Sequence, residues 1–321
     1  MKRAPRWLVE TVAWASALVL AAGVGIVVSG VITSKPVYGE TPVVSIPAQQ
    51  LQQQAPPQQV VKVTTRANTG VPQEASLGPP PGPYDDPRPT RFAAAQDRYA
   101  FLVGVTHYRK PTHDTIAGAQ DVQFIRSLLL ASGWPSENIR MVTDQQATGA
   151  AVRAGLTWLA AKSTPGTFTL FHFSGHVKQS GGHEKLWPYD RDFVPDTYLA
   201  STLGRGTGKL WVDVAGCEAA GFIEDLPSSR VLVSTSSKAT QKSYEFPEWG
   251  ESVWSGLVWD LGLAQGQADA NKNGITTVGE ALRWGAYYGQ AITLRQQPYG
   301  RQTPQVAGNP VRGWTLDDPP A

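Results

Sequence analysis

Two apolar runs of this chain end in side chains that can do chemistry. Residues 167–173 read TFTLFHF and lead into Ser174-Gly175-His176, and residues 209–216 lead into Cys217, the only cysteine among 321 residues. A lone thiol cannot form a disulfide within the chain, so it is either a small buried hydrophobe or a reactive group. A neighbouring imidazole can deprotonate a thiol and later protonate a leaving amine. His176 and Cys217 are therefore a candidate base and nucleophile.

The elements around these residues alternate in a way that would bring them together. Strand-length apolar runs occupy residues 99–105, 139–143, 167–173, 210–214 and 230–235, and helical patterns occupy 121–131, 252–263, 278–288 and a segment capped by Thr148. This alternation predicts an α/β fold, a mostly parallel central sheet with helices on both faces. Parallel strands end at one edge, where sites form. By strand alternation, His172 is predicted to be a structural residue deeper in its strand.

The first 90 residues differ from the rest. Residues 1–11 are basic, and residues 12–32 read VAWASALVLAAGVGIVVSGVI without a charge. A helix of this length would span about 32 Å, enough for a bilayer core of about 30 Å, so we expect an uncleaved membrane anchor. A cleaved signal peptide is the alternative. The basic cluster predicts a cytoplasmic N-terminus and an extracytoplasmic domain at residues 91–321. The Gln/Pro-rich residues 33–90 are predicted to be a disordered linker.

Charge and cysteine content exclude several classes of function. The chain carries 28 Lys+Arg against 26 Asp+Glu, a formal net charge of +2. This balance gives no electrostatic reason to expect a nucleic-acid partner. A single cysteine excludes a disulfide scaffold and any Cys-based zinc or iron–sulfur site. We expect no organic cofactor.

A second chemical signal lies at residues 269–280, which read DANKNGITTVGE. The stretch fits the twelve-residue calcium-loop pattern, whose oxygen ligands suit a hard cation and whose glycine allows a sharp turn. The alternative is an Asn/Gly turn leading into the last helix, with Glu280 in its first turn. The predicted Ca²⁺ ligands are Asp269, Asn271, Asn273, the Ile275 carbonyl and Glu280.

The ordered segments YAFLVGVTHY, AGAQDVQFIRSLLLASGWPSENIRMVTD, FHFSGH and WVDVAGCEAAGF resemble the peptidase domain of caspases and metacaspases. The resemblance covers roughly residues 98–306. It implies a caspase-like cysteine endopeptidase acting on a protein or peptide substrate, with His176 as general base and acid and Cys217 as nucleophile. The backbone N–H groups of Val177 and Cys217 would form the oxyanion hole. Because metacaspases commonly need calcium, the resemblance also implies Ca²⁺, at a site that it does not identify.

The resemblance further implies a pocket for a basic substrate residue, with cleavage after Arg or Lys. Asp121 and Ser174 match its positions. The chain departs from the family at Val177, usually Gly, and at Ala215, where metacaspases have Asp. Asp213 shares the face of Ala215 by alternation and would replace that acid if a small bulge occurs before Cys217. Otherwise half of the acidic pocket is missing.

Two departures keep other functions open. Val177 and Ala215 motivate a catalytically silent caspase-like binding module as the alternative function. Arg109 and Lys110 would favour an acidic substrate residue, unless they belong to a solvated loop. A mainly structural domain is the third possibility, but it leaves the ordered His and Cys motifs without a role.

Overall fold

The computed structural model describes residues 44–45, 89, 93–226, 229–296, 298–308 and 313–317, all within the compact unit Gly39–Ala321. The predicted anchor at residues 12–32 and almost all of the predicted linker lie outside these residues. Within the described part of the chain, no helix has both the length and the apolar character needed to cross a bilayer.

The centre of the fold is a six-stranded sheet with the order β12-β9-β8-β4-β2-β3. All neighbouring strands are parallel except β12, which runs antiparallel to β9 at one edge. The predicted mostly parallel sheet is confirmed, since the first five strands lie where the apolar runs place them. The strands are β2 (Arg98–Gly104), β3 (Ile139–Thr143), β4 (Phe168–Ser174), β8 (Lys209–Ala215), β9 (Val231–Thr235) and β12 (Gln305–Gly308).

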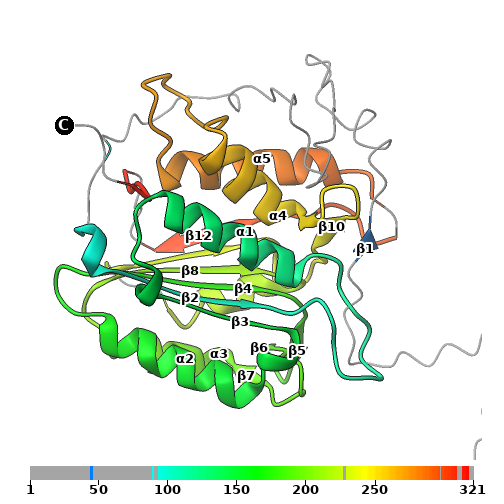
Figure 1. The fold of residues 1–321 in the computed structure, drawn as a ribbon. Coiled ribbons are helices and arrows are strands. Elements are labelled where there is room, and N and C mark those ends of the chain that lie inside the picture. Colours follow the sequence, from blue (N-terminus) through cyan, green and yellow to red (C-terminus); the bar gives the residue numbers. More distant parts are fainter. Residues whose placement is uncertain are drawn as a thin grey trace, which may run out of the picture. The chain divides into compact units, whose positions relative to one another are not determined.

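Helices cover both faces of this sheet, as predicted (Figure 1). Alternate strand residues point to opposite faces and build two apolar clusters. Leu170 and Trp211 belong to one cluster, whereas Phe171 and Val212 belong to the other. The first face carries α1 (Gly118–Ala131), α4 (Val253–Ser255), the π-helix η6 (Gly256–Ala264) and α5 (Val278–Thr293), and the second carries α2 (Gly149–Lys162) and α3 (Asp196–Leu203).

The helix predicted over residues 252–263 is the main departure in secondary structure. It begins as α4, capped by Ser252, and continues as the π-helix η6. A π-helix bonds residues five apart, so such residues come to one side of it. Trp254 and Trp259 are five apart, and both indole N–H groups donate to Asp213 at 2.8 Å. The wider helix thus lets two buried indoles share one carboxylate.

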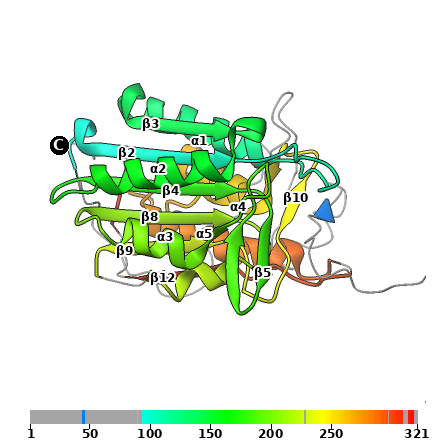
Figure 2. The ribbon, with the colours of Figure 1, turned by 90° about the horizontal axis from the view of Figure 1, so that it is seen from below.

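Short elements that the sequence did not predict lie at the edge where β2, β4 and β8 end (Figure 2). One small sheet follows β4, and the other contains the segment after β9. They are β5 (Val177–Ser180), β6 (His183–Leu186) and β7 (Val194–Pro195), and β1 (Val44–Ser45), β10 (Tyr244–Phe246) and β11 (Glu251–Ser252). Short 3-10 turns complete the described elements: η2 (Ala95–Asp97), η3 (Ser136–Asn138), η4 (Asp144–Gln146) and η5 (Ala219–Ile223).

Candidate active site

His176 and Cys217 follow neighbouring strands at the same edge of the sheet. β4 and β8 pair in parallel up to Ser174 and Ala215, so each reactive residue stands two positions beyond the last pair. The Gly175 N–H donates to the Ala215 carbonyl at 3.1 Å. A Cβ atom on Gly216 would lie 2.8 Å from the Gly175 carbonyl oxygen. The two turns are therefore in direct contact, and glycine at 216 permits that contact.

The ring of His176 is held by the loop between β2 and α1. Its Nε2 lies 2.9 Å from the His113 carbonyl oxygen. A carbonyl only accepts, so Nε2 carries the hydrogen and the neutral ring has its lone pair on Nδ1. The ring is almost fully buried and lies between two aromatic rings, with centroids 4.6 Å from Tyr108 and 5.7 Å from Trp187. This arrangement makes Nδ1 the basic nitrogen.

The thiol of Cys217 is buried, with 1% of the residue exposed. Burial raises its pKa to about 11, although the Ser243 N–H and the charge of Lys242 act in the opposite direction. The Ser243 N–H donates to Sγ at 3.3 Å. At neutral pH the group is therefore a thiol, and nucleophilic attack needs a base that removes its proton.

The directions of the Val177 and Cys217 N–H groups, the predicted oxyanion-hole donors, follow from the hydrogen bonds of their neighbours. Trp187 N–H donates to the His176 carbonyl at 3.1 Å, and Val177 opposes Leu186 in the β5–β6 ladder. Because that hydrogen bond joins the residues next to them, Val177 and Leu186 form a non-hydrogen-bonded pair, and the Val177 N–H faces away from β6. The Gly216 carbonyl accepts from Ser236 and Ser237, both at 2.9 Å. In the trans peptide the Cys217 N–H points the opposite way, away from those serines.

The structure brings Asp121 and Ser174 together. The Ser174 hydroxyl donates to the Asp121 carboxylate at 2.6 Å, and this carboxylate also accepts from Ser252 N–H at 3.0 Å and Ser255 Oγ at 2.9 Å. Asp121 is fully buried, and burial raises its pKa despite these donors. The pair lies at the end of β4, beside the site.

Asp213, in contrast, lies inside the core. The β4–β8 register is unbroken through Ser174 and Ala215, so no bulge precedes Cys217. Its carboxylate is fully buried and faces the helix layer of α4 and η6 rather than the strand end. The condition for Asp213 to replace the missing pocket acid is not met. Its four donors are His172 Nδ1, Ser234 Oγ, Trp254 Nε1 and Trp259 Nε1.

Glu245 is an acid near the site that sequence reasoning missed. It follows Ser243 by two residues, and its carboxylate accepts the N–H groups of Ile116 and Ala117 at 2.5 and 3.1 Å. Burial raises its pKa to about 8, and Asp121 adds to the effect. The same carboxylate raises the pKa of Cys217. A signal was present in the sequence, since an acid within the short apolar stretch YEF is unusual in a strand.

The predicted calcium loop folds as an Asx-rich turn followed by a capped helix. Asp269 accepts from Gly274 N–H at 2.8 Å, and Gly274 has φ +82. Glu280 and Thr277 form the capping box of α5, so Glu280 Oε2 already accepts from Thr277. Glu280 Oε1 accepts from Ala270 N–H at 3.2 Å. Both carboxylate oxygens that would hold Ca²⁺ are thus engaged by the turn itself.

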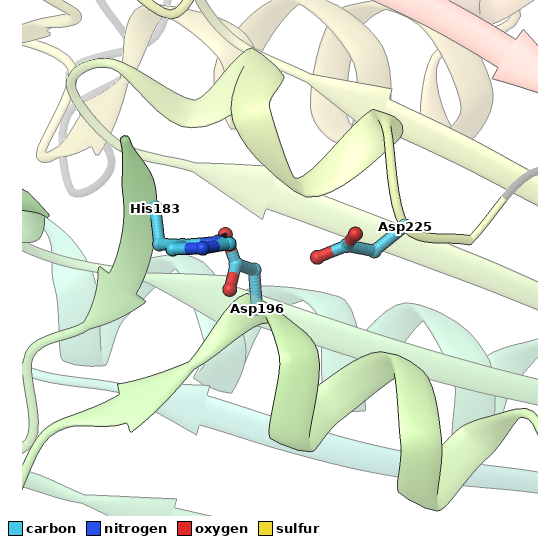
Figure 3. A group of neighbouring side chains, drawn as sticks. All are labelled: His183, Asp196 and Asp225. Atoms are coloured by element: carbon cyan, nitrogen blue, oxygen red, sulfur yellow. Dashed lines mark hydrogen bonds and ion pairs between the residues drawn. The ribbon is translucent and has the colours of Figure 1, made fainter. Parts of the chain in front are cut away.

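A second group of possible metal ligands is formed by His183, Asp196 and Asp225 (Figure 3). One ligand atom from each lies within 4.8 Å of the others. Asp196 is buried and its Oδ2 accepts from Glu184 N–H at 2.9 Å, whereas His183 and Asp225 are exposed. His183 lies in the hairpin after His176, Asp196 begins α3, and Asp225 lies in the segment after Cys217. Sequence reasoning missed it because its members are distant in the chain.

Comparison with known proteins finds a family similarity over part of the chain. Residues 97–250 match the family model of the caspase domain, and they contain both His176 and Cys217. Metacaspase-1 of Candida albicans is 27% identical over 155 residues, which are 40% of this chain and 34% of that protein. The chain thus spans about a third of the length of that relative. Residues 97–250 are thus similar to the caspase domain, and they contain the five parallel strands of the central sheet.

A similar solved structure is a crystal structure of a protein from Geobacter sulfurreducens. It has a TM-score of 0.47 and 16% sequence identity, over 67% of this chain and 94% of that one.

Proposed function

We propose that this protein is a caspase-like cysteine endopeptidase that cleaves after Arg or Lys with His176 and Cys217. The observation that carries the proposal is the contact between the two strand-end turns, together with the His113 carbonyl that fixes the imidazole. Nδ1 is then the nitrogen that can take a proton. The caspase-domain match over residues 97–250 supports the same reaction class.

The reaction follows from the roles of these groups. His176 Nδ1 takes the thiol proton as Sγ attacks the scissile carbonyl, and a carbon–sulfur bond forms. The resulting oxyanion is stabilised by the N–H groups of Val177 and Cys217. The carbon–nitrogen bond breaks as the imidazolium gives its proton to the leaving amine. Water, deprotonated by Nδ1, then hydrolyses the thioester and regenerates the thiol.

Specificity for a basic residue is supported by acids near the nucleophile. Asp121 and Ser174 lie at the end of β4, and Glu245 follows the residue that contacts Sγ. A cationic side chain beside these carboxylates would favour their ionised forms, which burial otherwise disfavours. Glu245 thus provides the second acid of the pocket, in place of the Asp that metacaspases have at the position of Ala215.

The experiment compares the full chain with Cys217→Ala, His176→Gln and, as a surface control, Ser127→Ala. Each protein is given fluorogenic peptides ending in Arg, Lys or Asp, and its fold is checked by tryptophan fluorescence. We expect cleavage after Arg and Lys in wild type and control, and a loss of at least about 10³-fold in both site variants. Equal turnover in wild type and Cys217→Ala would refute the proposal.

A second candidate function is a silent binding module, which one observation favours. Cys217 is 1% exposed and burial raises its pKa to about 11, so the resting thiol is neither accessible nor ionised. A peptidase must give the substrate access to this buried Sγ. A folded protein that binds a peptide without any turnover over the whole substrate panel would establish the module instead.

We extend the proposal to calcium, which the resemblance implies. Two groups offer ligands, the loop at residues 269–280 and the trio His183, Asp196 and Asp225. In the trio, Asp196 is already oriented by backbone N–H groups, as ligating carboxylates usually are. A bound cation there would tie together the segments that follow His176 and Cys217. Thermal shifts with Ca²⁺ in variants of each group distinguish the two.

The proposal also includes the single-pass membrane anchor at residues 12–32, with an extracytoplasmic domain. The uncharged stretch of 21 residues and the basic residues before it support this topology. In membranes isolated with the native orientation, the full chain should resist extraction at high pH. Protease added from the extracytoplasmic side should degrade the domain, and release of the chain by alkali would refute the anchor.

A further inference from the structure

The environment of His176 depends on one residue that the proposed chemistry does not name. Tyr108 lies in the loop between β2 and α1, and only 4% of it is exposed. Its hydroxyl oxygen accepts the backbone N–H of His176 at 2.7 Å. Its ring lies against the imidazole, with centroids 4.6 Å apart and planes inclined by 37°. One side chain thus contacts both the backbone and the ring of His176.

The neighbouring backbone is shaped around this hydroxyl. A Cβ atom on Gly175 would lie 2.5 Å from the Tyr108 oxygen, so a larger residue there would displace the phenol. The peptide after His176 is fixed from the other side, where its carbonyl accepts from Trp187 N–H. Tyr108 and Trp187 therefore hold the two peptide groups that flank His176. The second of these groups carries the Val177 N–H.

The loop that carries Tyr108 is itself held by two acids. Thr106 N–H and His107 N–H donate to Asp144, both at 2.8 Å, and Tyr108 N–H donates to Asp114 at 3.0 Å. The same loop contains His113, whose carbonyl accepts from Nε2. The loop thus sets the ring plane through Tyr108 and the tautomer through His113. Burial also raises the pKa of Tyr108 well above its usual value, which keeps the phenol neutral.

We infer that Tyr108 is a positioning residue that directs Nδ1 of His176 toward the thiol of Cys217. The inference rests on the proposed dyad, although it concerns the imidazole and can be tested without turnover. Loss of the hydroxyl leaves a buried N–H without its acceptor, and loss of the ring removes the contact that defines the imidazole plane. A small misplacement of a proton acceptor costs about 10²-fold in rate.

The test uses the full chain with Tyr108→Phe, which removes only the hydroxyl, and Tyr108→Leu, which also removes the ring. Tyr288→Phe is the matched control, because Tyr288 is equally buried but lies in α5, within the other apolar cluster. We expect kcat to fall about 10-fold in Tyr108→Phe and about 100-fold in Tyr108→Leu, with KM within about 2-fold. The control should retain wild-type kcat.

The rate of alkylation by iodoacetamide reports on Cys217 alone, since the chain has no other cysteine. The direction in which this rate changes distinguishes a misplaced imidazole from a loosened fold. A misplaced imidazole removes the thiol proton less readily as Sγ attacks iodoacetamide, so alkylation of the Tyr108 variants should be slower than that of wild type. A merely loosened fold would expose the thiol and make alkylation faster. Long-range ¹H–¹⁵N NMR of the imidazoles, with His176 assigned by His176→Gln, should show the Nε2–H tautomer in wild type and a mixture in Tyr108→Leu.

These outcomes separate the two proposals. Faster or unchanged alkylation with an unchanged tautomer, in variants that remain folded, would overturn the role of Tyr108. Absence of turnover in wild type would refute the peptidase and leave the alkylation and NMR comparisons to decide on Tyr108. Should Tyr108→Leu fail to fold, Tyr108→Phe answers the same question, because it keeps the ring.

Discussion

Replacement of Asp213 by Ala should destabilise the domain severely without acting on the site directly. The carboxylate accepts four buried donors at 2.5 to 2.8 Å, and the side chains that provide them are all fully buried. A buried donor left without an acceptor costs about 1–3 kcal/mol. Some of the four can find other partners, so we expect a loss of about 4 kcal/mol, in line with broken buried pairs.

The assay is urea unfolding followed by tryptophan fluorescence, to which Trp254 and Trp259 contribute directly. The matched control is Asp192→Ala, which breaks a two-bond pair with Arg153 at the surface, where Asp192 is 54% exposed. An exposed pair is worth about 0–1 kcal/mol. A loss below about 1 kcal/mol for Asp213→Ala would refute the core role. Altered preference between Arg and Asp substrates at unchanged stability would instead return Asp213 to the substrate pocket.

Three further predictions concern other parts of the domain. Burial raises the pKa of Glu245 from 4.5 to about 8, so its contribution to stability is complete below the unfolded pKa and is lost as pH rises through about 8. In urea unfolding across this pH range, the free energy of unfolding of Glu245→Gln should lack this decline. If it falls with pH in parallel with that of wild type, the prediction is contradicted. If Ca²⁺ binds, a free concentration of about 100 times its Kd adds about 2.7 kcal/mol to the free energy of unfolding and raises Tm by about 5–10 °C. Loss of the shift in Asp225→Asn alone assigns it to the trio, and loss in Asp269→Asn alone assigns it to the loop. Gly155→Ala would place a methyl 2.0 Å from the Phe101 ring, so we expect a loss of about 2 kcal/mol despite better helix propensity. An unchanged Tm would contradict that packing.

The central layers were predictable because their periodicities are strong. β2, β4 and β8 are nearly continuous apolar runs, as strands buried on both faces should be. Thr148 accepts from Ala151 N–H at 3.2 Å, which confirms the predicted cap of α2. The prediction that His172 is a structural residue is also confirmed, since it is fully buried and bound to Asp213.

The small elements at the sheet edge were not predictable from local pattern. β5 reads VKQS, which is mostly polar, and β10 reads YEF, which is only three residues long, so neither strand shows a period. Yet they carry Val177 and Glu245, and the residue before β10, Ser243, contacts the thiol of Cys217. The orienting carbonyl of His113 is backbone and therefore has no side-chain signature. Their roles depend on contacts between segments far apart in the chain.

Asp213 shows how a correct local inference can lead to the wrong site. Alternation placed it on the face of Ala215, and the structure agrees, since both lie toward α4 and η6. The prediction that Asp213 lines the substrate pocket is wrong because α4 and η6 already cover this face of β8 at Asp213, two residues before the strand ends. Glu245 reaches the same region from β10, outside the sheet that carries the reactive pair. In the proposed basic pocket, Glu245 would therefore supply from another element the acid that the expected position, an alanine, lacks.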